Sequence, residues 1–199
     1  MPSKPVGNMQ ILAADFKLKY RDVFDLKALY RVMDEWLKER DWVDAEDGKN
    51  HYEVFFLERT HAGGDKEFKF WWRPEQIPSD NSFYKYHLDI DVHCLFMLET
   101  EIMREGKKVK ADKGQLEIAL KAYIELDFEG KWSKHPLIRN FKEIFVKRIM
   151  KSDLYEKHKL ELYREAYRFS GMIKKYLKMK GFLPELEITP FHPGLQQQF

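Results

Sequence analysis

A chain of 199 residues is long enough for one domain with an apolar core and short for two, since domains cluster at about 100–150 residues. Its apolar fraction of 44% excludes a disordered protein, and its single cysteine, Cys94, excludes an intramolecular disulfide and a cysteine-ligated zinc cluster. Residues 1–129 carry 20 Lys and Arg against 26 Asp and Glu, whereas residues 130–180 carry 15 against 5. The C-terminal part is therefore a basic element on an acidic body.

The N-terminal segment has neither the apolar run nor the small-residue cleavage site of a secretory signal. No apolar run approaches the ~20 residues that span a bilayer. We therefore expect a soluble, cytoplasmic protein. Residues 1–14 would form an N-terminal lead, residues 15–180 one domain, and residues 181–199 an extended tail rich in proline and glutamine.

The first elements are predicted from periodicity. Apolar and charged residues alternate over residues 15–23, which predicts a half-buried strand. Asp25 then stands as N-cap of an amphipathic helix over residues 26–40, where apolar residues recur at i, i+3, i+4 and i+7. Residues 51–59 and 67–73, joined by a Gly-Gly turn, predict a hairpin. The loop 74–82 should cross an edge of the sheet as irregular structure.

Two long alternating segments follow, over residues 83–104 and 109–128, with a turn at residues 105–107. Even-numbered residues of both strands, Phe96 and Leu98 included, form the apolar set. A register centred on Gly106 gives the following pairs. They are Cys94 with Ile118, Val92 with Leu120, Ile90 with Ala122, Asp91 with Lys121, and Lys85 with Asp127. The length of the strands predicts a bulge or bend, which we place at Lys113–Gly114.

From Pro136 onward the period becomes helical, with one apolar stripe from Leu137 and a second from Leu162. Ser152 and Asp153, followed by Glu156, resemble a capping box, so a break near Ser152 is expected. Gly181 and Pro184 should end the second helix. The predicted fold is a single α+β domain, with a curved antiparallel sheet of about five long strands and the first helix over residues 15–129. This sheet packs against a long, broken helical region over residues 135–180.

This order of elements resembles the START-like, or helix-grip, superfamily. The residues that carry the resemblance are Phe16–Tyr20, Leu26–Trp36, the strands from His51 to Phe128, and the helix from Leu137. The resemblance is one of topology and spans residues 15–180. It implies a curved antiparallel sheet that wraps its last helix around an apolar cavity. The chain departs from that fold in its longer, broken helical region and its smaller number of strands.

Four residue types that ligate metals recur at period two, in His87, Asp89, Asp91 and His93. On a strand they project from one face but span roughly 20 Å, too far to share one ion. We interpret them as the solvent-exposed polar face of an antiparallel strand and keep a metal or acid/base site as the alternative. The other histidines, among them His158, are interpreted as surface or capping residues.

Motifs of serine hydrolases and nucleotide-binding loops are absent from the sequence. Cys94 lies in the apolar phase of its strand, where a thiol is inert. Trp71 is a large aromatic residue in the polar phase, flanked by Lys69 and Arg73. Such a residue either packs under a loop or meets a ligand or partner.

Two hypotheses for function follow, and neither involves a cofactor. The first is a non-enzymatic protein that binds a small apolar ligand between the sheet and the C-terminal helix. Its pocket would be lined by Phe70, Trp72, Leu88, Ile90, Val92, Leu120, Ile124, Phe141, Phe145 and Ile149. An enzyme is a third hypothesis, which the sequence supports less because no convergent polar groups are visible in it.

The second hypothesis is binding of nucleic acid or another polyanion by the basic helices. Its surface would comprise Lys147, Arg148, Lys151, Lys157, Arg164, Arg168, Lys174, Lys175 and Lys178. Glutamates three or four residues away support the alternative of an ordinary solvated helix face. The second apolar stripe should also extend past the sheet, so a homo-oligomer through the C-terminal helix is expected.

Overall fold

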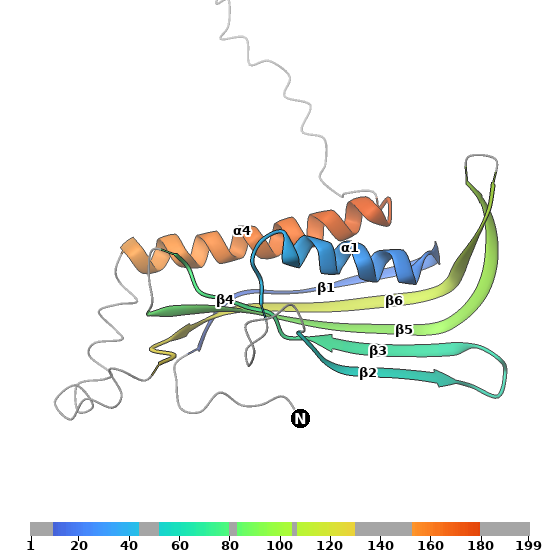
Figure 1. The fold of residues 1–199 in the computed structure, drawn as a ribbon, viewed down its shortest axis with the longest axis horizontal. Coiled ribbons are helices and arrows are strands. Elements are labelled where there is room, and N and C mark those ends of the chain that lie inside the picture. The colour runs from blue at the N-terminus through green and yellow to red at the C-terminus, as the bar shows by residue number, and fades with distance from the viewer. Residues whose placement is uncertain (1–9, 44–51, 80–82, 105–106, 130–152, 180–199) are drawn as a thin grey trace, which may run out of the picture.

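The computed structural model describes residues 10–43, 52–79, 83–104, 107–129 and 153–179. Within these ranges one antiparallel sheet of six strands is covered on one face by two helices (Figure 1), which confirms the α+β class. We call the covered side the helix face and the opposite side the outer face. No helix within the described ranges is long and apolar enough to cross a membrane.

The elements follow the predicted order. They are β1 (Gln10–Phe24), α1 (Leu26–Lys38), β2 (Glu53–Thr60), β3 (Lys66–Trp72), β4 (Glu75–Gln76), β5 (Tyr84–Arg104), β6 (Lys107–Leu126) and α4 (Asp153–Tyr176). The strand order across the sheet is β1-β6-β5-β3-β2, and β4 pairs with β5. The first and last strands of the sheet are thus neighbours.

The first helix begins where the sequence predicts, because Oδ1 of Asp25 accepts a hydrogen bond of 2.9 Å from the backbone N–H of Ala28. It ends two residues earlier than predicted. Asp41 takes a left-handed φ of 56°, and the N–H of Trp42 donates to the carbonyl oxygen of Leu37. This terminal turn satisfies carbonyls that the helix leaves open.

The predicted register of the two long strands is wrong by two residues. The observed pairs are Cys94–Leu116, Val92–Ile118, Ile90–Leu120, Asp91–Ala119, Asp89–Lys121 and Lys85–Glu125. Asp91 therefore faces Ala119 instead of Lys121, and Lys85 faces Glu125 instead of Asp127. Each face of the sheet keeps its predicted side chains here, because a shift of two residues preserves the alternation.

A bulge in β5 accounts for part of this shift. Residues 96–97 of β5 stand opposite a single residue of β6, Gly114. The irregularity thus lies across from the predicted bend. Phe96 takes a left-handed φ of 54° and is 64% exposed, whereas the alternation placed it in the buried set. Leu98, also expected inside, is exposed for the same reason.

Glycine is required opposite the bulge because the backbone of β5 approaches β6 closely there. A Cβ at Gly114 would lie 2.9 Å from the carbonyl oxygen of Leu95 and would also meet Sδ of Met97. Beyond the bulge, β5 and β6 continue as a two-stranded extension, residues 98–104 and 107–111, which we call the arm. The arm bends toward the helix face (Figure 1), so the sheet is curved at this end.

The segment 74–82, predicted to be irregular, contains the short strand β4. Its two residues, Glu75 and Gln76, pair with His87 and Tyr86 of β5. Val43 and Glu75 also exchange two backbone hydrogen bonds of 2.9 and 2.8 Å. The prediction is wrong for these residues because a strand of two residues shows no alternation.

Helix α4 (Asp153–Tyr176) lies along the helix face of the sheet (Figure 1), and the predicted break near Ser152 lies outside the described residues. The helical segment expected before Ser152 lies outside the described residues. The apolar stripe of α4 is buried in this chain itself, in Leu162, Ala166, Phe169, Ile173 and Leu177. These residues need no second copy of the chain to cover them, but Tyr163 of the same predicted stripe is exposed, so the homo-oligomer stays a prediction.

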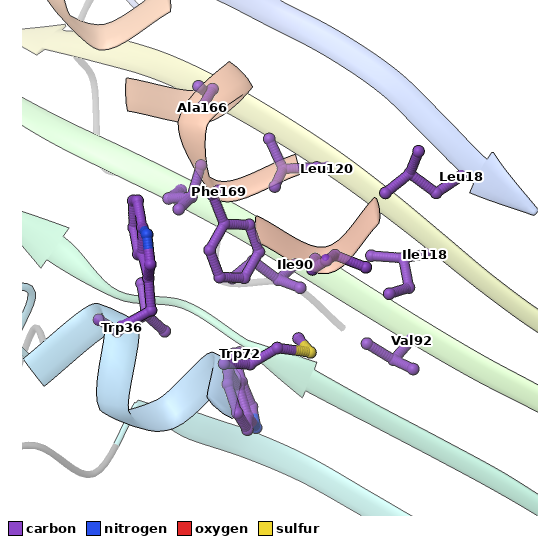
Figure 2. Packing of buried hydrophobic residues seen from close by; sticks show 14 of the residues in the cluster. Leu18, Trp36, Trp72, Ile90, Val92, Ile118, Leu120, Ala166 and Phe169 are labelled. Carbon is purple, nitrogen blue, oxygen red and sulfur yellow. The ribbon is translucent and has the colours of Figure 1, made fainter. Parts of the chain in front are cut away.

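The core fills the space between the two helices and the sheet. Figure 2 shows Phe169 of α4 over Ile90 and Leu120, with Trp36 of α1 beside it. The rings of Trp36 and Phe169 pack edge to face with centroids 5.0 Å apart. Each fully buried side chain of this size contributes about 1.5–3 kcal/mol through the hydrophobic effect. The helices are thereby fixed on the sheet.

Candidate functional site

The residues predicted to line an apolar ligand pocket form the core of the protein. Phe70, Trp72, Leu88, Ile90, Val92, Leu120 and Ile124 are all at most 1% exposed. Aromatic side chains from the helix side pack onto this set, as when the ring of Tyr30 meets that of Trp72 edge to face at 4.8 Å. The remaining predicted residues, Phe141, Phe145 and Ile149, lie outside the described residues.

A larger open space lies at the end of the helices, where the arm bends up. This groove has a volume of about 760 Å³ and is bounded by the end of β1, the start of α1, the arm and the last turns of α4. Its lining residues are Tyr20, Asp22, Val23, Phe24, Asp25, Val32, Met103, Lys110, Met172, Lys175, Tyr176, Leu177 and Lys178. The curvature of the sheet creates this space because the arm faces the helix ends (Figure 1).

The charged groups of the groove are unequally engaged. Asp25 caps α1, and Asp22 accepts a hydrogen bond of 2.8 Å from the N–H of Val23. Three lysines, Lys110, Lys175 and Lys178, are exposed at its rim and form no ion pair within the part of the chain that the structure describes. The groove therefore combines an apolar lining with unpaired positive charge.

One wall of the groove is built by the junction of helix and strand. The hydroxyl of Tyr176 on α4 donates a hydrogen bond of 3.1 Å to the carbonyl oxygen of Asp25, 151 positions away in the sequence. Burial and then the charge of Asp22 raise the pKa of the neighbouring Tyr20. Tyr20 is therefore a neutral hydroxyl at physiological pH.

The residues predicted to bind a polyanion are partly resolved on α4. Lys157, Arg164, Arg168, Lys175 and Lys178 are exposed and Lys174 is half-buried, whereas Lys147, Arg148 and Lys151 lie outside the described residues. Arg168 donates a hydrogen bond of 3.0 Å to Glu165. Glu165 also pairs with Arg40 of α1 at 3.0 Å. One predicted cation is thus partly neutralised by its own helix.

The outer face carries a network of charged side chains. The sequence predicted only a solvent-exposed polar face here. His87 was expected to be exposed, but it is buried at 8% exposure. Its Nδ1 lies 3.0 Å from Oε1 of Glu75, and its Nε2 lies 2.7 Å from Oε2 of Glu125. The ring of Tyr123 stacks on the imidazole at 4.7 Å. The strand β4, which supplies Glu75, covers this histidine.

Electrostatics in this network favour a charged histidine. Burial lowers the pKa of His87, but the hydrogen bonds and charges of Glu125 and Glu75 outweigh burial and raise the pKa above its usual value. Burial raises the pKa of Glu75, but the hydrogen bonds and charges of His87 and Lys85 outweigh burial, so the pKa of this carboxyl group is lowered. The imidazolium donates a hydrogen bond to each carboxylate, which gives His87 a structural role.

The other three metal candidates do not converge with His87. Asp91 accepts a hydrogen bond of 2.6 Å from Arg73, and burial raises the pKa of Asp89 despite the nearby Arg73. Nε2 of His93 lies 2.8 Å from Oε1 of Glu67. Hydrogen bonds from Lys69 and His93 lower the pKa of Glu67 to about 2. Within the described ranges no group of three or more His, Cys, Asp or Glu side chains is arranged to hold a metal ion.

Trp71 lies on the outer face beside a second, smaller cavity of about 250 Å³. The cavity is lined by Lys17, Lys69, Trp71, Asp91, Val92, His93, Glu117, Ile118 and Ala119. The ring of Trp71 stacks on that of Phe55 with centroids 4.3 Å apart. Trp71 is therefore half-buried and, unlike Phe70 and Trp72, stands outside the core at the edge of this cavity.

Two further predictions concern buried polar groups. Cys94 is fully buried, and burial followed by the charge of Asp112 raises the pKa of its thiol to about 12, in agreement with an inert thiol. His158 was interpreted as a surface residue, but it is fully buried and its Nδ1 lies 2.5 Å from the hydroxyl of Tyr86. That interpretation was wrong because a lone histidine carries no sequence signal of burial.

Sequence reasoning missed the residues that shape both cavities. The groove depends on Met103 and Lys110, which reach it only because the arm bends. The smaller cavity depends on Ala119, the one short side chain among the outward residues from 113 to 125 of β6, and this signal was visible in the sequence. No protein-family model matches the chain, and a search of curated proteins finds no match either.

Proposed function

We propose that this protein is a non-enzymatic binding protein that takes a small amphipathic molecule with an anionic end into the groove between the arm and α4. The single observation that carries the proposal is the groove of about 760 Å³, a size within the range of ligand sites, about 300–1,000 Å³. The proposed ligand would lie at the end of α4, away from the filled core.

The lining supports an apolar body for the ligand. Val23, Val32, Met103 and Met172 contribute aliphatic and thioether surface from three different elements and the arm. Methionine is unbranched and polarizable, so it adapts to ligands of varied shape. Met103 is 67% exposed, and covering it would remove apolar surface from water.

The rim supports an anionic end. Lys175 lies in the last turn of α4 and Lys178 just after it, and Lys110 lines the groove from the arm. The carboxylate of Asp25 is already used as a helix cap, so it does not neutralise them fully. A carboxylate or phosphate at the rim would form charge-assisted hydrogen bonds with these ammonium groups.

The resemblance to the helix-grip superfamily favours the same class of function. In that fold the sheet wraps the last helix around an apolar cavity, and here the proposed ligand lies between the curved sheet and the end of the last described helix. The difference is that the middle of the helix is packed against the sheet by Phe169 and Ile173. The ligand would therefore be held by the curved end of the sheet alone.

Calorimetric titration with decanoate, decanol and decyltrimethylammonium tests the proposal. Decanoate should bind most tightly, and Met103→Glu and Lys175→Glu should each weaken it at least tenfold, a change of about 1.4 kcal/mol. Arg164→Glu is the matched control, because Arg164 is an exposed cation on the same helix outside the groove. Equal binding of the three probes, or equal loss in the control, would contradict the proposal.

A second function, binding of a polyanion along α4, is favoured by one observation. Arg164, Lys174, Lys175 and Lys178 form no ion pair within the part of the chain described. Duplex DNA binding should then weaken with salt, with a log–log slope of about −0.9 per phosphate contact. Arg164→Glu should reduce this affinity while leaving decanoate binding intact, so the two functions are separable.

A further inference from the structure

We propose a second binding site, independent of the groove, on the outer face of the sheet. The cavity beside Trp71 would take a planar aromatic or heterocyclic ring that carries one anionic group. The site lies on the opposite face from α1 and α4, so neither its existence nor its test depends on the arm.

The pairing registers place five residues in one row across the sheet. From β2 to β1 the row reads Phe55, Trp71, Asp91, Ala119 and Lys17. Neighbouring strands are about 4.8 Å apart, so the backbones of β3 and β1 lie about 14 Å apart in this row. The row therefore has the aromatic side chain of Trp71 on one side and the cation Lys17 on the other, with Asp91 and the short side chain of Ala119 between them.

Ala119 makes the hollow. From residue 115 to residue 125 the other outward residues of β6 are long, namely Gln115, Glu117, Lys121, Tyr123 and Glu125. The methyl group of Ala119 forms the floor of the cavity, and the longer side chains of Trp71, His93 and Lys17 form its walls. A longer side chain at position 119, like those at the neighbouring outward positions, would fill the cavity.

Trp71 offers a ring face to this hollow. Its ring stacks on Phe55 at 4.3 Å with an interplanar angle of 28°. Phe55 comes from β2, on the far side of β3 from the cavity, and does not line it. A planar ligand ring in the cavity would therefore extend the stack on the other side of Trp71, as aromatic residues do with bases in nucleotide sites.

The charges around the cavity favour an anion. Both carboxylates are already engaged, since Asp91 receives Arg73 at 2.6 Å and Glu117 receives Lys19 at 2.7 Å. Lys17 is exposed and forms no ion pair within the described ranges. Lys69, the other cation of the lining, pairs with Glu67 at 3.0 Å, so Lys17 is left to pair with a ligand; in the row it is separated from Trp71 by Asp91 and Ala119.

His93 adds a polar contact for the ring edge. Its Nε2 lies 2.8 Å from Oε1 of Glu67, so in the neutral ring Nε2 carries the proton and donates this bond. Nδ1 is then an acceptor on a residue that lines the cavity. A heterocycle with an N–H or amino group would use this acceptor, whereas a plain aryl ring would not.

A nucleotide and an aryl carboxylate both combine a planar ring with an anionic group, and the following probes distinguish these two ligand classes. We would titrate AMP, adenosine, ribose 5-phosphate and 2-naphthoate, and follow tryptophan fluorescence and the amide resonance of Ala119. AMP should bind with a dissociation constant below about 1 mM, and adenosine and ribose 5-phosphate should each bind at least about tenfold more weakly. Tighter binding of 2-naphthoate than of AMP assigns the site to aryl carboxylates.

Four variants test the geometry. Trp71→Ala and Ala119→Leu should each weaken binding at least about tenfold, whereas Trp71→Phe should keep part of it because a ring remains. Lys17→Met should weaken AMP but not adenosine. Arg21→Met is the matched control, since Arg21 is an exposed cation on β1 that does not line the cavity. All substituted side chains point outward, and circular dichroism checks that the variants are folded.

Two results would overturn the proposal. One is the absence of any change at Ala119 with AMP and with 2-naphthoate at about 5 mM, well above the expected dissociation constant. The other is binding that persists unchanged in folded Trp71→Ala and Ala119→Leu proteins. Decanoate binding in the groove should be unaffected by these variants, because none of the substituted residues lines it, so failure here and failure of the groove are distinguishable.

Discussion

Nε2 of His87 lies 2.7 Å from Oε2 of Glu125, diagonally across the β5–β6 pair. The same imidazole reaches Glu75 of β4 through Nδ1, so one side chain ties the short strand to the sheet. Its pKa is raised in the folded protein, because the two carboxylates favour the protonated ring more than burial disfavours it.

Stability should therefore fall as pH rises through the folded-state pKa of His87. A group whose pKa is raised on folding contributes its full stabilisation below its unfolded value near 6.5 and loses it above the folded value. His87→Gln should lower the free energy of unfolding on the order of 3 kcal/mol at about pH 6, and by less at about pH 9. Urea unfolding at both pH values measures this. His61→Gln, at a more exposed histidine of the β2–β3 hairpin, is the control, and an equal loss at both pH values for H87Q would contradict the role of His87.

Two glycine substitutions should have opposite effects. Gly114→Ala should destabilise the protein by about 1–3 kcal/mol, because the new Cβ meets the backbone of Leu95 at 2.9 Å. Gly171→Ala, in the middle of α4 with no atom near the new Cβ, should stabilise it by about 1 kcal/mol through helix propensity. Chemical denaturation of both variants checks the prediction, and a neutral G114A would argue against the bulge geometry.

The end of α4 should be improved by glycine. Lys178 takes a left-handed φ of 51°, where the N–H of Met179 donates to the carbonyl oxygen of Lys174 at 2.9 Å. Lys178→Gly should raise the free energy of unfolding by about 1 kcal/mol, because glycine adopts this conformation without steric cost. Arg164→Gly, in the helix interior, should lower it by a similar amount. The same sign for both variants in thermal unfolding would place the helix end elsewhere.

Cys94 should react with thiol reagents only after unfolding. Its side chain is fully buried, and burial raises the pKa of the thiol to about 12, so almost no thiolate is present at about pH 8. Labelling with Ellman's reagent should be slow in buffer and rapid in denaturant. Rapid labelling of the folded protein would show that β5 opens near Phe68, the residue that pairs with Cys94.

The elements were predictable because strong periodic patterns mark them, as in α1, where buried Leu29, Met33, Trp36 and Leu37 recur at helical spacing. The register of β5 against β6 was not, because the extra residue of β5 at Phe96–Met97 shifts the partners, whereas the alternation over residues 84–94 is the same in either register. The burial of His87 was also invisible, since it depends on β4 folding back over it. Both cavities arise from the tertiary arrangement. Ala119, an alanine among long polar residues, is the one lining residue for which the sequence held a signal, and that signal was missed.

The neighbour relation between β1 and β6 constrains how the chain acquires its structure. Lys19 and Glu117, which pair at 2.7 Å, are separated by 98 positions in the sequence. During synthesis β1 emerges first, yet its only partner in the described sheet emerges after β2 to β5. Lysines on an edge strand disfavour wrong pairing before β6 is available. The pairing of β1 with β6 should accordingly be the slow, late event of folding, and α1 should form well before it.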